Sequence, residues 1–252
     1  MLEIHGLNHY FGGLQAVKDL SFDVIQGSIK ALIGPNGAGK TTLFNLIAGD
    51  IQPRSGSIAL DGKPIKGLKP FRIAELGLSR TFQTTRLFPQ MTVLENVMIG
   101  RHTHSKAGFL SCILNLPWTW KEEREIKEKA LSLLETLELS GCAQEAAENL
   151  SFGQQRLVEI ARALATEPKL LLLDEPAAGL NYFETEAIAR LISTIRDWGT
   201  TILIVEHDMS LVMDISEEIV VINYGEKLAE GRPGEIQKNP EVIKTYLGVD
   251  HA

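Results

Sequence analysis

The sequence predicts an α/β fold in which a mostly parallel sheet carries an inserted helical subdomain. An apolar run at 29–33 leads through a glycine-rich loop into a helical pattern. The leucine run at 170–173 lacks polar alternation, as expected for a parallel strand covered on both faces. Strand and helix patterns then continue to alternate. The 252 residues suffice for one large domain, or for a core with a smaller subdomain.

The first part of the chain predicts short antiparallel strands. Apolar residues alternate loosely there, with a turn signal at Gly12-Gly13. A helix is expected at 42–48, ending at Gly49, and the strand pattern resumes at 57–62. These features predict an N-terminal antiparallel β subdomain beside the parallel sheet.

The middle of the chain predicts a helical subdomain. Apolar residues recur at helical spacing in the charged stretch 121–139 and again in 156–165. We therefore expect a single domain over the whole chain, with its core at 1–83 and 166–252 and the helical subdomain at about 84–165.

After the leucine run, the pattern predicts a helix, a strand and a hairpin. Ile188 and Ile195 lie on one face of the expected helix, and the next strand covers 201–205. A hairpin is expected around Tyr224-Gly225. These elements would complete the sheet.

The composition limits the possible functions. A hydrophobic fraction of 44% is typical of globular proteins, and a net charge of −7 argues against a nucleic-acid partner. Cys112 and Cys142 are too few for a disulfide scaffold or a zinc site, so we expect buried thiols.

No segment predicts a signal peptide or a membrane span. Glu3 and His5 interrupt any early apolar stretch. The apolar segment 107–120 is shorter than a spanning helix and we expect Pro117 to break it, so it should pack or face a partner.

The glycine-rich loop predicts a site for a nucleoside triphosphate. In such a loop, backbone N–H groups turn toward phosphate oxygens, and the following helix N-terminus adds positive potential. Lys40 would reach the β- and γ-phosphates, and the Thr41 hydroxyl would bind Mg²⁺. A turn that only links strand to helix is the alternative. The predicted nucleotide-binding residues of the loop are Gly34, Pro35, Asn36, Gly37, Ala38, Gly39, Lys40, Thr41 and Thr42.

Further candidate residues follow predicted strands. Asp174 suits a contact with Mg²⁺, and Glu175 is placed to act as a general base on a water molecule. His207 could contact the γ-phosphate or orient that water, and the Gln83 amide could reach both the metal and the water. A strand-end turn with two solvated acids is the alternative for the acidic pair, and neither His207 nor Gln83 identifies a site by itself.

A capping box is expected before the helix at 156–165. Ser151 and Gln154 have the required spacing. A cap does not require Gly153, however, and a glycine near a helix start permits close approach of an anion.

Together these motifs resemble those of the ATP-binding subunits of ABC transporters. The resemblance assigns, in chain order, Walker A at 34–41, the Q-loop at Gln83, the signature motif at 150–154, Walker B with its catalytic Glu175 at 170–175, the D-loop at 178–181 and the switch histidine at His207. Phe11 matches the aromatic residue that stacks on adenine, with Tyr10 as the alternative. Two positions depart from the usual pattern, because Phe152 replaces a glycine and Asn181 stands where aspartate is frequent.

Finer features resemble one subgroup of this family. The segments 81–83, 87–97, 175–181 and 246–248 look like those of subunits that energise branched-chain amino acid importers. Importers of urea or short-chain amides and exporters of lipopolysaccharide are alternatives. A soluble ABC ATPase acting on nucleic acid or the ribosome is a further alternative, but it usually carries two cassettes or long insertions.

The resemblance also implies cofactors, partners and a location. It implies ATP and Mg²⁺, the ABC ATPase fold, and a head-to-tail dimer with a second copy or a close paralogue. Each nucleotide would lie between one Walker A loop and the other subunit's signature residues, which are Ser151, Phe152, Gly153 and Gln154.

The remaining partners would be multi-span permease subunits and, indirectly, an external substrate-binding protein. The subunit would lie peripherally at the cytoplasmic face of the inner (plasma) membrane. The segment 83–97 is the candidate groove for the permease, with Phe88, Met91 and Val93 as apolar anchors. Ordinary internal packing is the alternative for each anchor.

Overall fold

The computed structural model describes residues 1–83, 86–101 and 117–247, with the backbone alone for 117–119 and 246–247. The chain forms two compact units. Met1–Arg80 and Lys169–Ala252 make up the first, called the core unit below, and Thr81–Pro168 the second, called the helical unit.

The core unit contains a six-stranded sheet in the order β10-β9-β3-β8-β7-β6. Its strands are β3 (Ile29–Ile33), β6 (Leu78–Arg80), β7 (Leu170–Asp174), β8 (Thr201–Val205), β9 (Glu218–Asn223) and β10 (Glu226–Gly231). All neighbours run parallel except β9 and β10, which confirms the mostly parallel sheet. Every residue of β3, β7 and β8 is buried, as the unbroken apolar runs predict.

A four-stranded antiparallel sheet in the order β2-β1-β4-β5 confirms the predicted β subdomain. Its strands are β1 (Leu2–Phe11), β2 (Leu14–Val24), β4 (Ser55–Leu60) and β5 (Lys63–Pro64). The strands β1 and β2 are longer than expected, because shifts in their register keep the pairing intact through irregular stretches.

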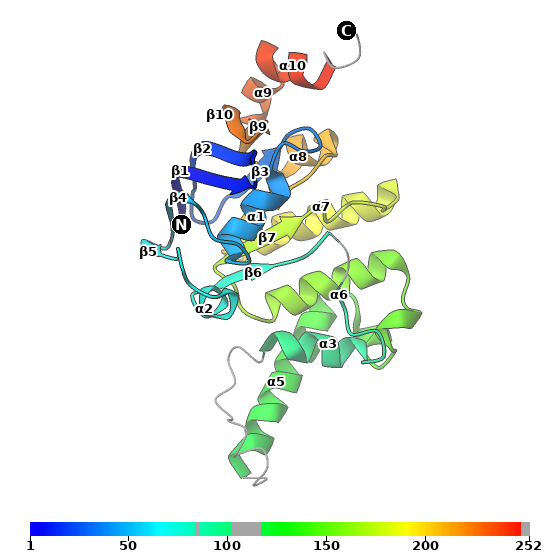
Figure 1. The fold of residues 1–252 in the computed structure, drawn as a ribbon. Helices are drawn as coiled ribbons and strands as arrows, with labels where there is room; N and C mark the ends of the chain where they lie inside the picture. The colour runs from blue at the N-terminus through cyan, green and yellow to red at the C-terminus, as the bar shows by residue number, and fades with distance from the viewer. Residues whose placement is uncertain (84–85, 102–116, 248–252) are drawn as a thin grey trace. The chain divides into compact units, whose positions relative to one another are not determined.

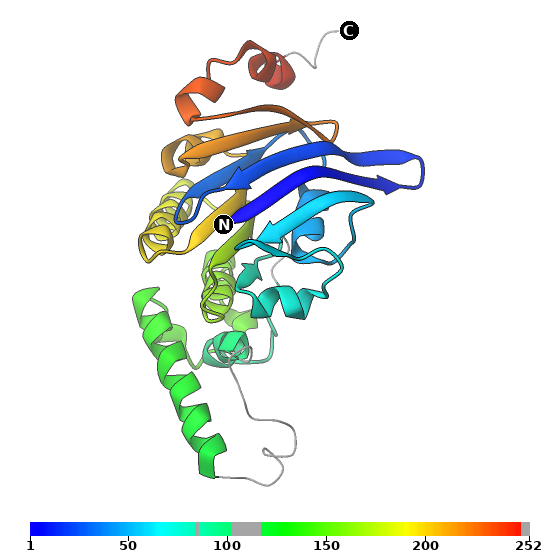
Figure 2. The same cartoon turned by 90° about the vertical axis from the view of Figure 1, so that its left-hand side faces the viewer.

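The helix α1 (Lys40–Ala48) lies between the two sheets of the core unit (Figures 1 and 2). Its apolar residues, such as Leu43 and Phe44, join one buried cluster with residues of both sheets. The helix starts two residues before the predicted range and ends at Gly49, which has a φ of 80°.

The helices α7 (Tyr182–Asp197) and α8 (Met209–Ile215) cover the other face of the parallel sheet (Figure 2). Ile188 and Ile195 of α7 are buried as predicted. The predicted hairpin joins β9 to β10, where Tyr224 and Gly225 have φ values of 47° and 81°. The remaining helices of the core unit are α2 (Pro70–Glu75), α9 (Pro233–Ile236) and α10 (Pro240–Leu247).

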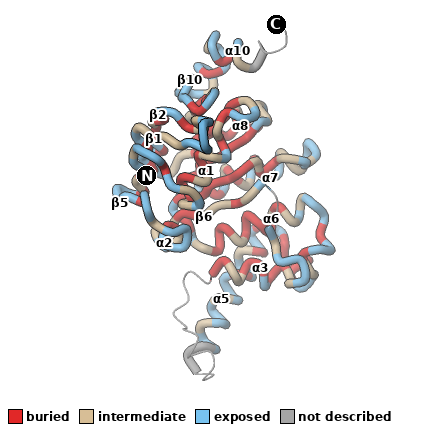
Figure 3. The backbone as a smooth tube through the Cα atoms, viewed as in Figure 1, coloured by how far each residue is buried: buried red, intermediate tan, exposed pale blue. Residues whose placement is uncertain are grey.

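The helical unit packs α3 (Val93–Gly100) against α5 (Pro117–Thr136) and α6 (Phe152–Leu164). The backbones of α3 and α6 approach closely, because a Cβ at Gly100 would lie 2.1 Å from the carbonyl oxygen of Arg162. Two short 3₁₀ helices, Ser140–Cys142 and Ala147–Asn149, connect α5 to α6. Burial concentrates in the sheet strands of the core unit and on the inner faces of α3 and α6 (Figure 3).

The helix predicted at 121–139 is shifted toward the N-terminus. It begins at Pro117, since proline is well tolerated in a first helical turn, and it ends before Glu138, which has a φ of 59°. Pro117 therefore starts a helix, where a break was expected. Most of the apolar segment 107–120 lies outside the described residues, but Trp120 is exposed on α5.

Cys142 is buried as predicted, and burial raises the pKa of its thiol. Cys112 lies outside the described residues. Among the helices that the structure describes, none combines the length and apolar character that a membrane span requires.

Candidate functional site

The phosphate-binding loop connects β3 to α1, as its strand and helix flanks predict. Glycine is required at two of its positions by close packing within the core unit. A Cβ at Gly34 would lie 2.2 Å from the carbonyl oxygen of Ile222, and one at Gly39 would lie 2.4 Å from that of Ala16. The loop is therefore seated against the ends of two other strands.

Lys40 already points its ammonium group into this loop. Its Nζ donates to the carbonyl oxygens of Gly34 at 2.7 Å and Pro35 at 3.1 Å. Burial lowers the pKa of Lys40, while the carboxylates of Glu175 and Asp174 act in the opposite direction. Thr41 is exposed at the start of α1.

Asp174 ends β7 and is buried. Burial raises the pKa of its carboxyl, and the nearby Arg80 guanidinium counteracts this rise. The Nη2 atom of Arg80 lies 2.9 Å from Oδ2 of Asp174. Arg80 also donates to Oδ1 of Asn45 at 2.7 Å and lies 3.2 Å from Oδ2 of Asp50. Sequence analysis missed Arg80, although its place at the end of a sheet strand is a usable signal.

Glu175 takes an unusual backbone conformation, with a φ of 48°. Its N–H donates to the carbonyl oxygen of Val205 at 2.9 Å, so the chain turns sharply just beyond the β7 ladder. The carboxylate lies next to the loop after β8, where Nδ1 of His207 is 3.8 Å from Oε2 of Glu175. The His207 side chain is largely exposed.

The core unit thus gathers many of the predicted residues at one sheet edge. In the order β3-β8-β7, the carboxyl ends of neighbouring parallel strands carry the phosphate loop, His207 and the acidic pair. Ligands of open α/β sheets bind at such an edge. The arrangement can hold a phosphate beside a cation and place a carboxylate and an imidazole near it.

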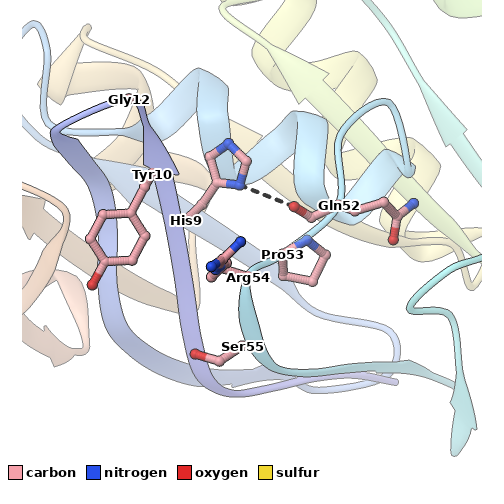
Figure 4. A pocket seen from close by; sticks show the side chains of 7 residues that line it. All are labelled: His9, Tyr10, Gly12, Gln52, Pro53, Arg54 and Ser55. Atoms are coloured by element: carbon pink, nitrogen blue, oxygen red, sulfur yellow. Dashed lines mark hydrogen bonds between the residues drawn. The ribbon is translucent and has the colours of Figure 1, made fainter.

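Phe11 ends β1 with its ring half exposed, so a base can stack on it. His9 packs edge-on against that ring, with centroids 4.6 Å apart. His9 also lines an open pocket of about 1010 Å³ and contacts the carbonyl oxygen of Gln52 through Nδ1 (Figure 4). Tyr10 lines the same pocket, together with Gly12 and the segment 52–55 (Figure 4).

The predicted signature residues lie in the helical unit, at the start of α6. The capping box is confirmed, because Ser151 Oγ accepts from the Gln154 N–H at 3.3 Å and Gln154 Oε1 accepts from the Ser151 N–H at 3.1 Å. Phe152 is about half exposed, with the Arg156 guanidinium 5.2 Å from its ring centroid. Gly153, the next residue of this first turn, is partly exposed.

A buried ion pair on α6 holds the backbone that leads to Gln83. Arg156 and Glu159 lie 3.2 Å apart, and both are buried. Arg156 donates to the carbonyl oxygens of Phe82 and Gln83, and Glu159 accepts from the Phe82 N–H at 3.1 Å. The Gln83 residue is exposed. Sequence analysis missed this pair, whose i,i+3 spacing on a helix is a weak signal.

The candidate docking segment presents only part of its apolar residues. Phe88 is half exposed and Met91 is partly exposed, whereas Val93 is completely buried inside the helical unit. Asn96 is buried and bonds the backbone of Phe88 in both directions, at 2.8 and 3.1 Å. Val93 is therefore wrong as an exposed anchor, since the first turn of α3 faces inward there.

Two family models match the chain. The model described as ABC transporter covers residues 17–178, and the one described as branched-chain amino acid ATP-binding cassette transporter covers residues 226–252.

Curated relatives match almost end to end. The high-affinity branched-chain amino acid transport ATP-binding protein BraF of Pseudomonas aeruginosa is 48% identical over 98% of both chains. The protein of the same description from Escherichia coli, LivG, is 45% identical over 98% of both chains.

Solved structures agree in fold. The ADP conformation of an ATP-binding cassette of an ABC transporter is 35% identical, with a TM-score of 0.86 and 98% of both chains covered. A dimeric cassette bound to ADP and Pi is 26% identical, with a TM-score of 0.78 and coverage of 92% of this chain and 99% of that one. The match of motifs, fold and nearly full-length relatives establishes that this chain belongs to the ABC transporter family, as an ATP-binding cassette.

Proposed function

We propose that the chain is the ATP-hydrolysing subunit of an importer for branched-chain amino acids. The arrangement of Lys40, Asp174, Glu175 and His207 at one sheet edge carries the hydrolytic part of this proposal. The transported substrate rests on the names of the relatives, which favour branched-chain amino acids over amides or lipopolysaccharide.

ATP would bind first through its phosphates. The Lys40 ammonium would leave the carbonyl oxygens of Gly34 and Pro35 for the β- and γ-phosphates, whose greater negative charge favours the exchange. The N–H groups at the start of α1 would face the phosphate oxygens. Phe11 would stack on the adenine, since its ring is accessible.

The residues present fit a magnesium ion. Thr41 offers a hydroxyl and Asp174 a buried carboxylate, both hard oxygen donors. Among the described residues, no group of three or more acidic, histidine or cysteine side chains could hold a metal. This suits an ion that takes its other ligands from phosphates and water. When bound, it would neutralise phosphate charge, and Gln83 remains a further predicted ligand.

Glu175 would act as the general base of hydrolysis. Its carboxylate would accept a proton from the water that attacks the γ-phosphorus. His207, within 3.8 Å of that carboxylate, would contact the γ-phosphate and keep the water in line. Gln83 is a second candidate for orienting the water.

The site would be completed by a second ATP-binding subunit in head-to-tail arrangement. The exposed Ser151 and the partly exposed Gly153 would supply phosphate contacts at the N-terminus of α6. The dimeric cassette among the similar structures supports such a pairing. The division into a core of 1–83 and 166–252 and a helical subdomain of about 84–165 is part of this proposal.

Permease subunits would receive the segment around Phe88 and Met91, and the protein would then lie peripherally at the cytoplasmic face of the membrane. An external binding protein would deliver the amino acid.

Reconstitution tests the whole proposal. The chain, copurified with its permease subunits, would be placed in proteoliposomes with ATP on its own side. We expect ATP-dependent uptake of radiolabelled leucine in the presence of the binding protein. Uptake of urea or short-chain amides in place of leucine would reassign the substrate, and uptake without ATP hydrolysis would contradict the role of this subunit.

A further inference from the structure

Glu206 is a completely buried carboxylate next to the candidate hydrolytic residues. It lies directly after β8, and its two oxygens bond different loops. Oε1 accepts from the N–H of Ala177 at 2.8 Å, and Oε2 accepts from the N–H groups of His207 at 3.0 Å and Asp208 at 3.4 Å. One side chain therefore ties the loop after β7 to the loop after β8.

These two loops carry the proposed base and the switch histidine. Ala177 follows Glu175 by two residues, and His207 follows Glu206 directly. The Nδ1 atom of His207 lies 3.7 Å from Oε2 of Glu206 and 3.8 Å from Oε2 of Glu175. The imidazole thus sits beside both carboxylates.

The far side of the histidine loop is anchored as well. The Asp208 side chain caps α8 by accepting from the N–H groups of Ser210 at 2.9 Å and Leu211 at 3.2 Å. The backbone of His207 is therefore held on both sides. The hydrogen bond from the Ala177 N–H to Glu206 links this loop to the loop after β7 through a buried side chain.

A buried carboxylate has a free-energy cost that needs compensation. Burial raises the pKa of Glu206, and the N–H bonds from Ala177, His207 and Asp208 act against that rise. The hydrogen bonds that offset this cost come from both loops, so the buried side chain fixes the distance between those loops.

We propose that Glu206 is a positioning residue that sets the placement of Glu175 relative to His207 and thereby the rate of ATP hydrolysis. It rests on the hydrolytic roles of Glu175 and His207 in the proposed function. Glu206 itself does not touch the nucleotide in this mechanism. Errors of about 1 Å in such a placement can cost about 100-fold in rate, while binding contacts stay intact.

The test uses Glu206→Gln in the full chain. Glutamine has the same shape, but its NH₂ group would face a backbone N–H on one of the two loops, so one tie is lost. We expect kcat to fall about 10- to 100-fold, with KM and the Kd for ATP within about 2-fold of wild type. Glu217→Gln is the matched control, because Glu217 also accepts from a backbone N–H, at the opposite edge of the sheet. Its kcat should be unchanged.

A double-mutant cycle separates positioning from a structural role. In the His207→Ala background, measured by single turnover with excess enzyme, Glu206→Gln should slow hydrolysis less than 3-fold, because its route through His207 is gone. Equal effects in both backgrounds would overturn the proposal, as would a kcat that is unchanged by Glu206→Gln.

A parallel measurement distinguishes this failure from that of the proposed function. If Glu175→Gln hydrolyses ATP at the normal rate, Glu175 is not the base and the proposed function fails. If Glu175→Gln is inactive but Glu206→Gln keeps the wild-type kcat, only the positioning role of Glu206 is overturned. If Glu206→Gln does not fold, Glu206→Asp keeps the charge but cannot span both loops, and it should show the same selective loss of kcat.

Discussion

At the scale of single residues, Lys40 stands out because its ammonium group is hydrogen-bonded within the phosphate-binding loop. It bonds two carbonyl oxygens of its own loop, and burial lowers its pKa. Phosphate oxygens would replace these partners with more negative ones.

Replacing Lys40 with alanine should therefore weaken ATP binding itself. Loss of charge-assisted hydrogen bonds is worth about 1.5–3 kcal/mol, which corresponds to about a 10- to 100-fold higher Kd. Isothermal titration calorimetry measures the Kd for ATP. Lys63→Ala, on the exposed strand β5, is the control and should bind like wild type. Equal affinities for Lys40→Ala and wild type would contradict the assignment of the loop.

Arg80 is a second residue with a local consequence for stability. Its side chain and that of Asp174 are only 7% and 4% exposed. Removing Arg80 takes away the guanidinium that is hydrogen-bonded to the buried Asp174 carboxylate, so Arg80→Ala should lower the free energy of unfolding by about 3 kcal/mol. Urea titration measures this change.

The matched control is Arg72→Ala, which breaks an exposed pair with Glu75 on α2. Exposed pairs contribute about 0–1 kcal/mol, so this variant should unfold nearly like wild type. Similar losses for the two variants would mean that burial of the Arg80 pair has no energetic effect.

At the scale of elements, α6 holds the chain at Phe82 through the buried pair of Arg156 and Glu159. Burial raises the pKa of Glu159, although its bonds to the Phe82 N–H and to Arg156 act against this rise. The folded protein therefore holds a proton on Glu159 more strongly than the unfolded chain does.

This shift predicts a pH dependence of stability. Between the unfolded pKa of about 4.3 and the higher folded value, the folded state binds more protons, so the contribution of Glu159 to stability falls as pH rises. Glu159→Gln lacks this change. The difference in unfolding free energy, wild type minus variant, should therefore decrease from about pH 4 to pH 7 in urea titrations. A difference that grows with pH would contradict the direction of the shift.

The segment before α3 is a second element with a separable role. Phe88 is half exposed and its backbone is hydrogen-bonded to the buried Asn96, whereas Val93 is completely buried. Replacing Phe88 by serine and Met91 by alanine should abolish copurification with the permease without lowering the unfolding temperature.

Two control variants separate loss of the docking surface from general effects on the surface or the fold. Phe71→Ser removes an equally exposed aromatic ring from the core unit and should leave copurification intact. Val93→Ala should instead destabilise the fold by roughly 1–3 kcal/mol, since its side chain is fully buried. Copurification that survives the double substitution would place the docking surface elsewhere.

At the scale of the whole molecule, the proposed site needs two chains. Glu175→Gln should keep ATP binding but reduce hydrolysis by about 100- to 10,000-fold, the usual contribution of a general base. ATP would then hold the two subunits together, so size-exclusion chromatography with ATP and Mg²⁺ should show a dimer. Glu186→Gln, on the exposed face of α7, is the control. A variant that hydrolyses ATP at the normal rate would rule out Glu175 as the base.

The sequence by itself determined the features that depend on neighbouring residues. The phosphate loop, the buried parallel strands, the capping box at Ser151 and the glycine at position 49 are local patterns, and the structure contains each of them. The order of the motifs along the chain was enough to identify the family. Local periodicity also set the fold class, because strand and helix repeats differ in period.

Only the tertiary structure decided which polar groups meet. Arg80 bonds Asp174 across 94 positions, Glu159 bonds Phe82 across 77, and Glu206 bonds Ala177 across 29. It also turned Val93 inward. Such pairings depend on which strand ends lie side by side and on which polar groups lose their hydrogen bonds to water when they are buried. A buried charge must find its partner wherever the fold brings one, and spacing along the chain does not record that place.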